Sequence, residues 1–369
     1  MDFSKIFIKD ANPTKMGGQA VMEGIMMKGS DRTAIAVRRA DGTINVKEEP
    51  LKPRSRWMKI PLIRGVVIFV DSLVTGVGTL MYSAGVLEED IPEEESEEPG
   101  KFEAWLQKKF GDKGVFNFLL YSSVVISLVI SIGLFVLLPT WVVDLCRHFT
   151  ENKIALNLIE GCLRIIMFVA YIAGISQMND IKRVFQYHGA EHQTIHCFEN
   201  GLELTPENCA SFETLHPRCG TSFLMFVMII SLLLFSLLGW PNIWIRLGSR
   251  LLLIPVVAGL SYELLKWAGS SESFLVKLLS VPGLLMQKLT TKVPDESMLE
   301  VAIVAVNVCL SDNEPEDRIY DVDSKGNPVD RAALKAAAAA EAEGTGTTEE
   351  PEAQDADGSG QQEAESPEA

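Results

Sequence analysis

Long apolar runs alternate with polar stretches along this chain, and the runs predict membrane-spanning helices. Val115 to Leu138 contains no charged side chain. At about 1.5 Å per residue, this run exceeds the roughly 20 residues that cross the hydrocarbon core of a bilayer. Three further runs are long and mostly apolar: Ile154 to Ile175, Ser222 to Gly239 and Ile245 to Trp267. The pattern predicts four transmembrane helices within residues 115–268.

Charged residues inside these runs are few, and each needs a partner in an apolar environment. Glu160 and Arg164 lie four residues apart, so a helix brings them to the same face, where they can pair inside the bundle. They could also line a polar site, but an ion pair is the simpler interpretation. Glu263 lies near the end of the fourth predicted span and is either a partner for Lys266 or an additional ligand of a polar site.

The segment before the first span, residues 61–114, is less regular. Pro61 to Val86 is apolar, but Arg64, Asp71 and several glycines interrupt it. We therefore expect an interfacial or re-entrant helix rather than a fifth span. The acidic cluster from Glu88 to Glu98 that follows predicts a solvated linker.

The first 60 residues predict a small α+β region. Thr33 to Glu48 reads as two short strands around Asp41-Gly42, a dipeptide that tight hairpins favour. The preceding GGQAVMEG, residues 17–24, has neither the Rossmann nor the phosphate-loop spacing of glycines. We interpret it as a turn-rich loop and not as a nucleotide site.

The C-terminal part combines amphipathic helices with an acidic tail. Residues 269–310 contain two stretches with helical spacing of apolar positions, Phe274 to Leu289 and Met298 to Leu310. Residues 311–369 hold 17 acidic and 4 basic side chains, within a chain whose net charge is −16. Such a segment cannot bury a core and is expected to be disordered. Without it the chain is nearly neutral, which argues against a nucleic-acid partner.

Most lysines and arginines precede Val115 or follow Trp267. The positive-inside rule therefore places both termini in the cytoplasm. With four crossings, the polar segment Gln177 to Thr221 lies on the same side. The predicted fold is mainly α: an integral membrane bundle of about four transmembrane helices, a small cytoplasmic N-terminal α+β region with a β-hairpin, and a disordered acidic C-terminal tail. The expected partner is the lipid bilayer.

Histidines are concentrated in this polar segment, which holds four of the five in the chain. If Tyr187 to Phe198 is helical, the step of about 100° per residue places three histidines and one glutamate on one face. These residues are His188, His192, His196 and Glu191. The order H-x-x-E-H is that of the inverzincin enzymes, in which both histidines bind zinc and the glutamate acts as general base.

A second group of donors follows shortly after, in LHPRCGTS. His216 and Cys219 add an imidazole and a thiol, so His196, His216, Cys219 or Glu263 could complete the site of a divalent metal ion, most readily zinc. The alternative is a set of interfacial histidines in a loop between two spans. Arg218 is either a contact for an anionic substrate group or a cytoplasmic anchor.

Several motifs occur in a specific order: GGQAVMEGIMMKG, YHGAEHQTIHCFENG, LHPRCGTSF, PGLLMQKLTT and LEVAI. On these motifs the chain resembles the YqhQ-like family of bacterial membrane proteins, over about residues 16–308. That family carries a domain of unknown function and is described as predicted metal-dependent enzymes. The resemblance implies a location in the bacterial inner membrane. It also implies that a set of residues belongs to family motifs: Gly18, Gln19, Met22, Glu23, Gly24, His188, Glu191, His192, His196, His216, Pro217, Arg218, Cys219 and Gln287.

Three functions are compatible with these patterns. The first is a metal-dependent hydrolase at the cytoplasmic face, in which Glu191 activates water and the substrate is a lipid-linked, envelope or membrane-peptide molecule. The second is a non-catalytic scaffold or regulator whose metal site is structural. A transporter is less favoured, because few polar residues occur within the spans. The sequence does not fix the oligomeric state. Whether the glycine-rich motif, through Gln19 or Glu23, reaches the histidine segment is a further open hypothesis.

Overall fold

The computed structural model describes residues 16–52, 60–90, 112–145, 152–238, 242–270 and 273–334, together with Ile6, Asn12 and Thr14. The chain divides into two compact units, Met1–Val329 and Asp330–Ala369. Only residues 330–334 of the second unit are described, so most of the acidic tail and the acidic linker after residue 90 lie outside the described part. The described chain is mainly helical with one small sheet, as expected.

The sheet has five antiparallel strands in sequential order, β1 to β5. They are β1 (Gly17–Val21), β2 (Gly24–Lys28), β3 (Arg32–Arg38), β4 (Ile44–Pro50) and β5 (Arg318–Val322). The predicted hairpin around Asp41-Gly42 is confirmed as β3 and β4, with Gly42 at a φ of 85° that favours glycine.

Three strands were not predicted. The glycine-rich stretch, which we expected to be a turn-rich loop, forms the β1–β2 hairpin, with Glu23 at its turn at a φ of 49°. Glycines at its start mask the alternation that normally indicates a strand. Residues 318–322, which we placed in the disordered tail, form β5 against β4, where Val322 is buried opposite Ile44. The acidic composition around this short segment hid it.

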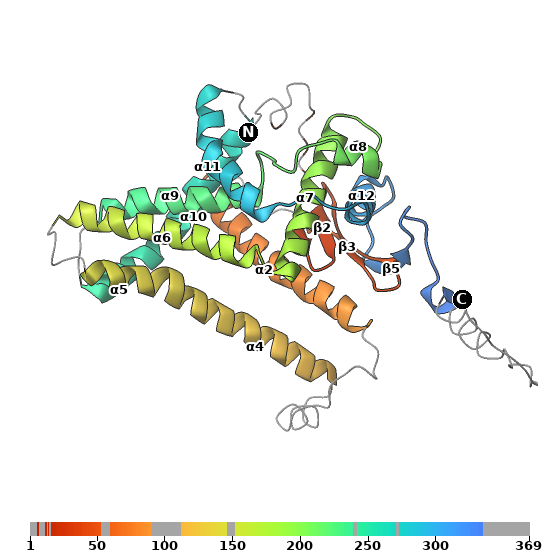
Figure 1. The fold of residues 1–369 in the computed structure, drawn as a ribbon, viewed down its shortest axis with the longest axis horizontal. Coiled ribbons are helices and arrows are strands. Elements are labelled where there is room, and N and C mark those ends of the chain that lie inside the picture. Colours follow the sequence, from red (N-terminus) through yellow and green to blue (C-terminus); the bar gives the residue numbers. More distant parts are fainter. Residues whose placement is uncertain are drawn as a thin grey trace, which may run out of the picture. The chain divides into compact units, whose positions relative to one another are not determined.

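Both faces of the sheet are covered. The helices α7 (Asn179–Glu199) and α12 (Glu296–Leu310) pack on one face, with the short α8 (Pro206–Ala210) beside them, while the end of α2 (Ile63–Glu88) packs on the other (Figure 1). We expected α12 to be an amphipathic surface helix, but most of its residues are buried. Its apolar residues surround the whole helix, which is typical of a core helix and not of a surface one.

The remaining helices form the apolar part of the first unit. They are α4 (Asp112–Ile132), the π-helical turn η3 (Gly133–Leu137), α5 (Leu138–Leu145), α6 (Lys153–Ile175), α9 (Gly220–Ser236), α10 (Ile243–Ser270) and α11 (Phe274–Thr290). Four helical stretches of the described chain are long and apolar enough to cross a bilayer: α2, Tyr121–Leu145, α6 and Trp244–Ala268. The expected third span, α9, is a shorter apolar helix that packs against α6, α10 and α11.

The helix α2 contacts both the apolar helices and the sheet of this unit. Near its start, Gly65 lies against Gly259 of α10. Near its end, Tyr82 donates a hydrogen bond to Asn45 of β4 over 2.6 Å, and Val86 is buried in the core beneath the sheet. This helix therefore ties the sheet to the apolar helices.

The buried carboxylate inside the apolar helices is paired. The predicted ion pair is confirmed, since Arg164 donates to Glu160 over 3.0 Å. Two partners were not anticipated: Arg250 of α10 donates to both oxygens of Glu160, and the Thr140 hydroxyl adds a bond of 2.8 Å. This cluster joins three helices through one buried carboxylate.

The contact between α7 and residue 292 gives a test of the packing. A Cβ on Gly189 would lie 2.0 Å from the carbonyl oxygen of Lys292, whereas a Cβ on Gly85 of α2 would meet nothing within 4 Å. We expect Gly189→Ala to destabilise the fold by about 1–3 kcal/mol, because backbone must move. Gly85→Ala should be neutral or stabilising, because alanine favours a helix. Thermal unfolding of the purified protein in detergent measures both; equal midpoints for the two variants would refute the packing described here.

Candidate metal centre

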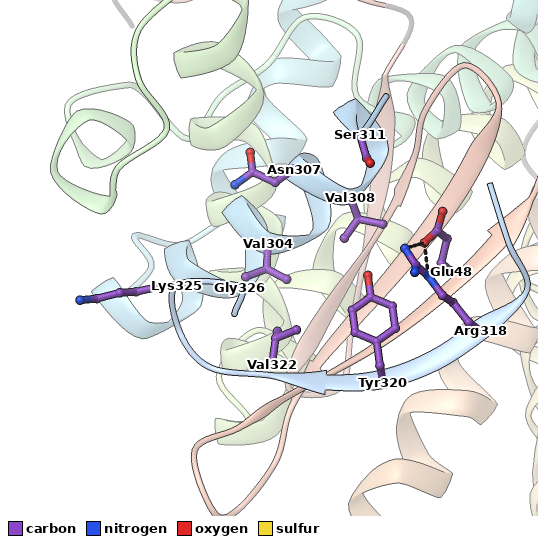
Figure 2. Close-up of a pocket in the computed structure, with 10 residues that line it drawn as sticks. All are labelled: Glu48, Val304, Asn307, Val308, Ser311, Arg318, Tyr320, Val322, Lys325 and Gly326. Carbon is purple, nitrogen blue, oxygen red and sulfur yellow. Dashed lines mark hydrogen bonds and ion pairs between the residues drawn. The ribbon is translucent and has the colours of Figure 1, made fainter. Parts of the chain in front are cut away.

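A cavity of about 620 Å³ lies where β1 meets α7, the segment before α9 and the middle of α2. It contains most of the residues that the sequence singled out, including His188, Glu191, His192, His216 and Cys219. A second cavity, of about 260 Å³, lies between α12 and β5, where Tyr320 and Val322 point towards Val304 and Val308 (Figure 2). No histidine or cysteine lines that second cavity, so the site chemistry is concentrated in the first.

Two histidines of α7 are oriented by backbone carbonyls. The Nδ1 atom of His188 lies 2.8 Å from the carbonyl oxygen of Thr290, and the Nδ1 atom of His192 lies 2.6 Å from that of Thr214. A carbonyl accepts only, so both rings carry their proton on Nδ1 and present the lone pair of Nε2. Metal-binding histidines are commonly held in this way.

Cys219 completes this group of donors. Its Sγ atom lies 3.1 Å from Nε2 of His188, and one ligand atom from each of His188, His192 and Cys219 lies within 4.8 Å of the others. Cys219 is the N-cap of α9 and accepts a hydrogen bond from the Thr221 amide. Burial raises its pKa, but His192 and Thr221 outweigh this effect, and the pKa of the thiol is lowered. A thiolate is the form that binds metal ions.

Glu191 lies beside these donors, and one of its two carboxylate oxygens is hydrogen-bonded. Its Oε1 accepts a hydrogen bond of 2.9 Å from the Gly18 amide of β1, while its buried Oε2 has no partner among the residues that the structure describes. Burial raises the pKa of Glu191 to about 7, against a smaller lowering by His188 and Gly18. A carboxyl group with a pKa near neutrality can take up and release a proton at cellular pH.

The other two histidines of the motif have different partners. His196 places Nε2 at 3.0 Å from the carbonyl oxygen of Leu215, and its ring stacks on Phe212. His216 lies with Nε2 at 3.8 Å from Glu199, and Arg218 forms an ion pair with the same carboxylate. The structure therefore does not bring His196 and His216 into the group formed by His188, His192 and Cys219.

The remaining sequence candidates are dispersed. Glu263 pairs with Arg64 through both oxygens, on α10 and α2, and not with the histidines. Gln287 is fully buried and bonds both the amide and the carbonyl of His216, at 2.8 Å each. Gln19 donates to the Gly76 carbonyl of α2 over 3.2 Å.

The glycine-rich motif does reach α7, but through its backbone. Gly18 bonds Glu191, whereas Glu23 accepts bonds from Arg183 and Tyr187, which precede His188 by five residues and by one residue. Met22 is exposed at the hairpin turn, and Gly24 begins β2. A Cβ on Gly18 would lie 2.9 Å from the Glu191 carboxyl carbon, so only glycine allows this approach.

One further residue, Glu199, was not singled out by the sequence. It accepts hydrogen bonds from the Thr14 amide at 2.8 Å and hydroxyl at 3.0 Å as well as from Arg218. A signal was available, since Glu199 lies three residues after His196 on the same helix face. Its partners come from segments distant in the sequence, which no periodicity reveals.

The Glu199 contacts predict an acid-sensitive contribution to stability. Burial raises the pKa of Glu199, but the nearby His216 ring, hydrogen bonds from Thr14 and the charge of Arg218 outweigh it and lower the pKa to about 2. A carboxylate whose pKa is lowered by folding stabilises the fold at pH values above its pKa in the unfolded chain. This contribution is lost as the pH falls towards about 2. The free energy of unfolding of wild type should therefore exceed that of Glu199→Gln by roughly 2 kcal/mol at neutral pH. The difference should shrink between about pH 5 and 2, as measured by thermal unfolding. A difference that does not change with pH would contradict this assignment.

Comparisons with known proteins agree with the motif pattern. A family model described as "Protein of unknown function (DUF1385)" matches residues 60–312. The chain is 35% identical over 303 residues to "Uncharacterized protein YqhQ" of Bacillus subtilis, covering 81% of this chain and 93% of that protein. No solved structure matches. The chain therefore belongs to the YqhQ-like DUF1385 family, whose function is unknown.

Proposed function

We propose that this protein is a metal-dependent hydrolase that acts at the cytoplasmic face of the bacterial inner membrane. One observation carries the proposal: two histidine Nε2 atoms and one thiol converge beside a buried carboxylate whose second oxygen has no partner among the described residues. This group lines a cavity of about 620 Å³, within the roughly 300–1,000 Å³ usual for ligand sites.

The donor set fits a zinc ion. Histidine nitrogen and cysteine sulfur are the ligands that zinc prefers, and three protein ligands leave a position for water or substrate. His188, His192 and Cys219 would hold the ion, and the Thr290 and Thr214 carbonyls would fix the two imidazoles. His196 and His216 would support the segment that carries Cys219. A bound zinc ion would lower the pKa of water and polarise the bond to be cleaved.

Glu191 supplies the proton chemistry in this proposal. The Gly18 amide holds Oε1, so Oε2 accepts the proton of the attacking water and delivers it to the leaving group. Burial keeps bulk water from competing for this oxygen.

A second candidate uses Cys219 directly as a nucleophile. The thiol lies at the N-terminus of α9 and 3.1 Å from Nε2 of His188, an arrangement that also activates a thiolate without metal. We favour the metal site because two histidines, and not one, place a ring nitrogen within 4.8 Å of the same sulfur. The scaffold role considered from the sequence would retain the metal site without requiring Glu191.

The membrane setting is part of the proposal. Four apolar helical stretches are long enough to span a bilayer, which is consistent with a membrane protein. We propose that α4–α5, α6, α10 and the shorter apolar helix α9 cross it while α2 lies at the interface, which leaves β1–β5, α7 and α12 together on one side. This grouping agrees with their packing in one core. The positive-inside rule makes that side, and both termini, cytoplasmic.

Metal analysis tests the ligand assignment. Protein purified without added chelator should contain about one zinc ion per chain, and the His188→Ala/His192→Ala double variant and Cys219→Ala should lose it. His148→Ala, which removes the one histidine outside the Gln177 to Thr221 segment, should retain it. Elemental analysis by mass spectrometry measures all four proteins. Metal-free wild type combined with hydrolysis that iodoacetamide abolishes would support the thiol mechanism instead.

Glu191→Gln separates catalysis from a structural site. The variant should keep its zinc and lose at least about a hundredfold in kcat on a p-nitrophenyl ester, because a general base contributes this much. Glu207→Gln, an exchange outside the cavity on α8, should behave as wild type. Unchanged hydrolysis in Glu191→Gln would leave the scaffold role as the better explanation of the site.

A further inference from the structure

The cavity has an unusual wall: the free edge of a β-sheet. Among the described residues, β1 pairs with β2 alone, so one side of its backbone faces away from the sheet. The Gly18 amide points to this outer side, because it donates to Glu191 and not to β2. In an antiparallel ladder the outward groups recur at every second residue, so the amide and carbonyl of Ala20 point outward as well. Neither group of Ala20 has a hydrogen-bond partner within the described chain.

The edge also faces the cavity along its length, except at Gly18, whose amide is bonded to Glu191. Residues 16–20 all line the cavity, and a Cβ built on Gly17 would meet nothing within 4 Å. Glycine in a strand often marks a place where another backbone approaches closely. The opposite wall is polar, with Asp71, Ser72 and Thr75 of α2.

Apart from the proposed zinc ion, the described wall of the cavity offers no unpaired cation to an anionic ligand. Among its described lining residues, Lys28 and Arg218 carry full positive charges. Lys28 lies 2.8 Å from Asp71, and Arg218 pairs with Glu199. No described cation of this wall is therefore left over for a phosphate group. A neutral backbone with regularly spaced donors and acceptors matches the wall better than a phospholipid headgroup does.

Building on the proposed hydrolase, we infer that its substrate is an extended polypeptide segment that binds as an added strand along the outer edge of β1. A residue of the substrate pairs with the amide and carbonyl of Ala20. Two residues further on, about 7 Å along the strand, the Gly18 amide is already bonded to Glu191, so the substrate backbone turns away from β1 there and passes beside the Glu191 carboxylate. Strand addition therefore places a peptide bond of the substrate beside Glu191, the proposed general base. Hydrolysis adds water across that bond and yields a carboxylate and an amine.

The test uses full-length protein in lipid nanodiscs and a pool of short, fluorescein-labelled, unstructured peptides. Fluorescence anisotropy on a Glu191→Gln background measures binding without turnover. Adding Ala20→Pro removes the outward amide without breaking a bond to β2, and should weaken binding at least about tenfold while the zinc content stays unchanged. Ile319→Pro is the matched control on the other edge strand. Asp321 accepts from Val329 on the outer side of β5, so the Ile319 amide, two residues before, also points away from β4.

Ala20→Pro could disturb the hairpin, so a second measurement changes the ligand. The same peptides methylated on their backbone nitrogens should bind the Glu191→Gln protein at least about tenfold more weakly than the unmethylated peptides, because they cannot donate to the Ala20 carbonyl. Equal binding of methylated and unmethylated peptides would overturn the inference. Equal binding by Ala20→Pro and Ile319→Pro would overturn it as well.

The outcomes distinguish this inference from the proposed function. Zinc-dependent cleavage of the peptide pool by wild type, at least about tenfold slower in kcat/KM for Ala20→Pro, supports both. Zinc-dependent cleavage of p-nitrophenyl phosphate or phosphatidic acid vesicles with no peptide cleavage retains the hydrolase and rejects the peptide. Absence of zinc and of all hydrolysis rejects the proposed function and, with it, this substrate.

Discussion

Burial of the polar helix α7 is the constraint on which the rest of this structure depends. From Tyr187 to Glu199 nearly every residue is buried, although the segment contains three histidines and two glutamates. A buried polar group without a partner costs roughly 1–3 kcal/mol, so the surroundings must supply donors and acceptors. They do so with backbone: the carbonyls of Thr214, Leu215 and Thr290 and the amide of Gly18. These groups come from segments far apart in the chain, and α7 therefore organises the sheet, the loop before α9 and the end of α11 around itself.

This constraint also explains why the histidine motif divides into two groups with different tasks. His188 and His192 direct Nδ1 to carbonyls and leave Nε2 for the cavity, next to Cys219. His196 uses Nε2 for the Leu215 carbonyl, and His216 lies beside Glu199, so neither presents a free nitrogen at the same point. Gln287 holds His216 through both backbone groups. The second group thus fixes the segment 214–219, and with it the position of the thiol, while the first group supplies the lone pairs.

The sequence was informative where one element carries a complete pattern. Helical periodicity grouped His188, Glu191 and His192 correctly on one face, Asp41-Gly42 located a hairpin, and the four-residue spacing of Glu160 and Arg164 identified an ion pair. It was uninformative where the partner lies elsewhere in the chain. Glu263 looked suited to the histidine site by depth in its helix, yet Arg64, from a helix much earlier in the sequence, takes both of its oxygens. The roles of Arg250 and Glu199 could not be predicted for the same reason. β1 escaped because its glycines remove the alternating side chains that identify a strand.

Those glycines account for the link between the sheet and the chemistry. A side chain at residue 18 would collide with the Met26 carbonyl and with Glu191, so a strand edge can approach α7 only where the side chain is missing. The approach has two effects at once: it gives the Glu191 carboxylate a donor, and it leaves the outer edge of β1 facing the cavity. An exposed strand edge is normally a liability, because it recruits other chains indiscriminately. Here it is short and enclosed by α2 and α7, so only a segment that fits between those helices can pair with it.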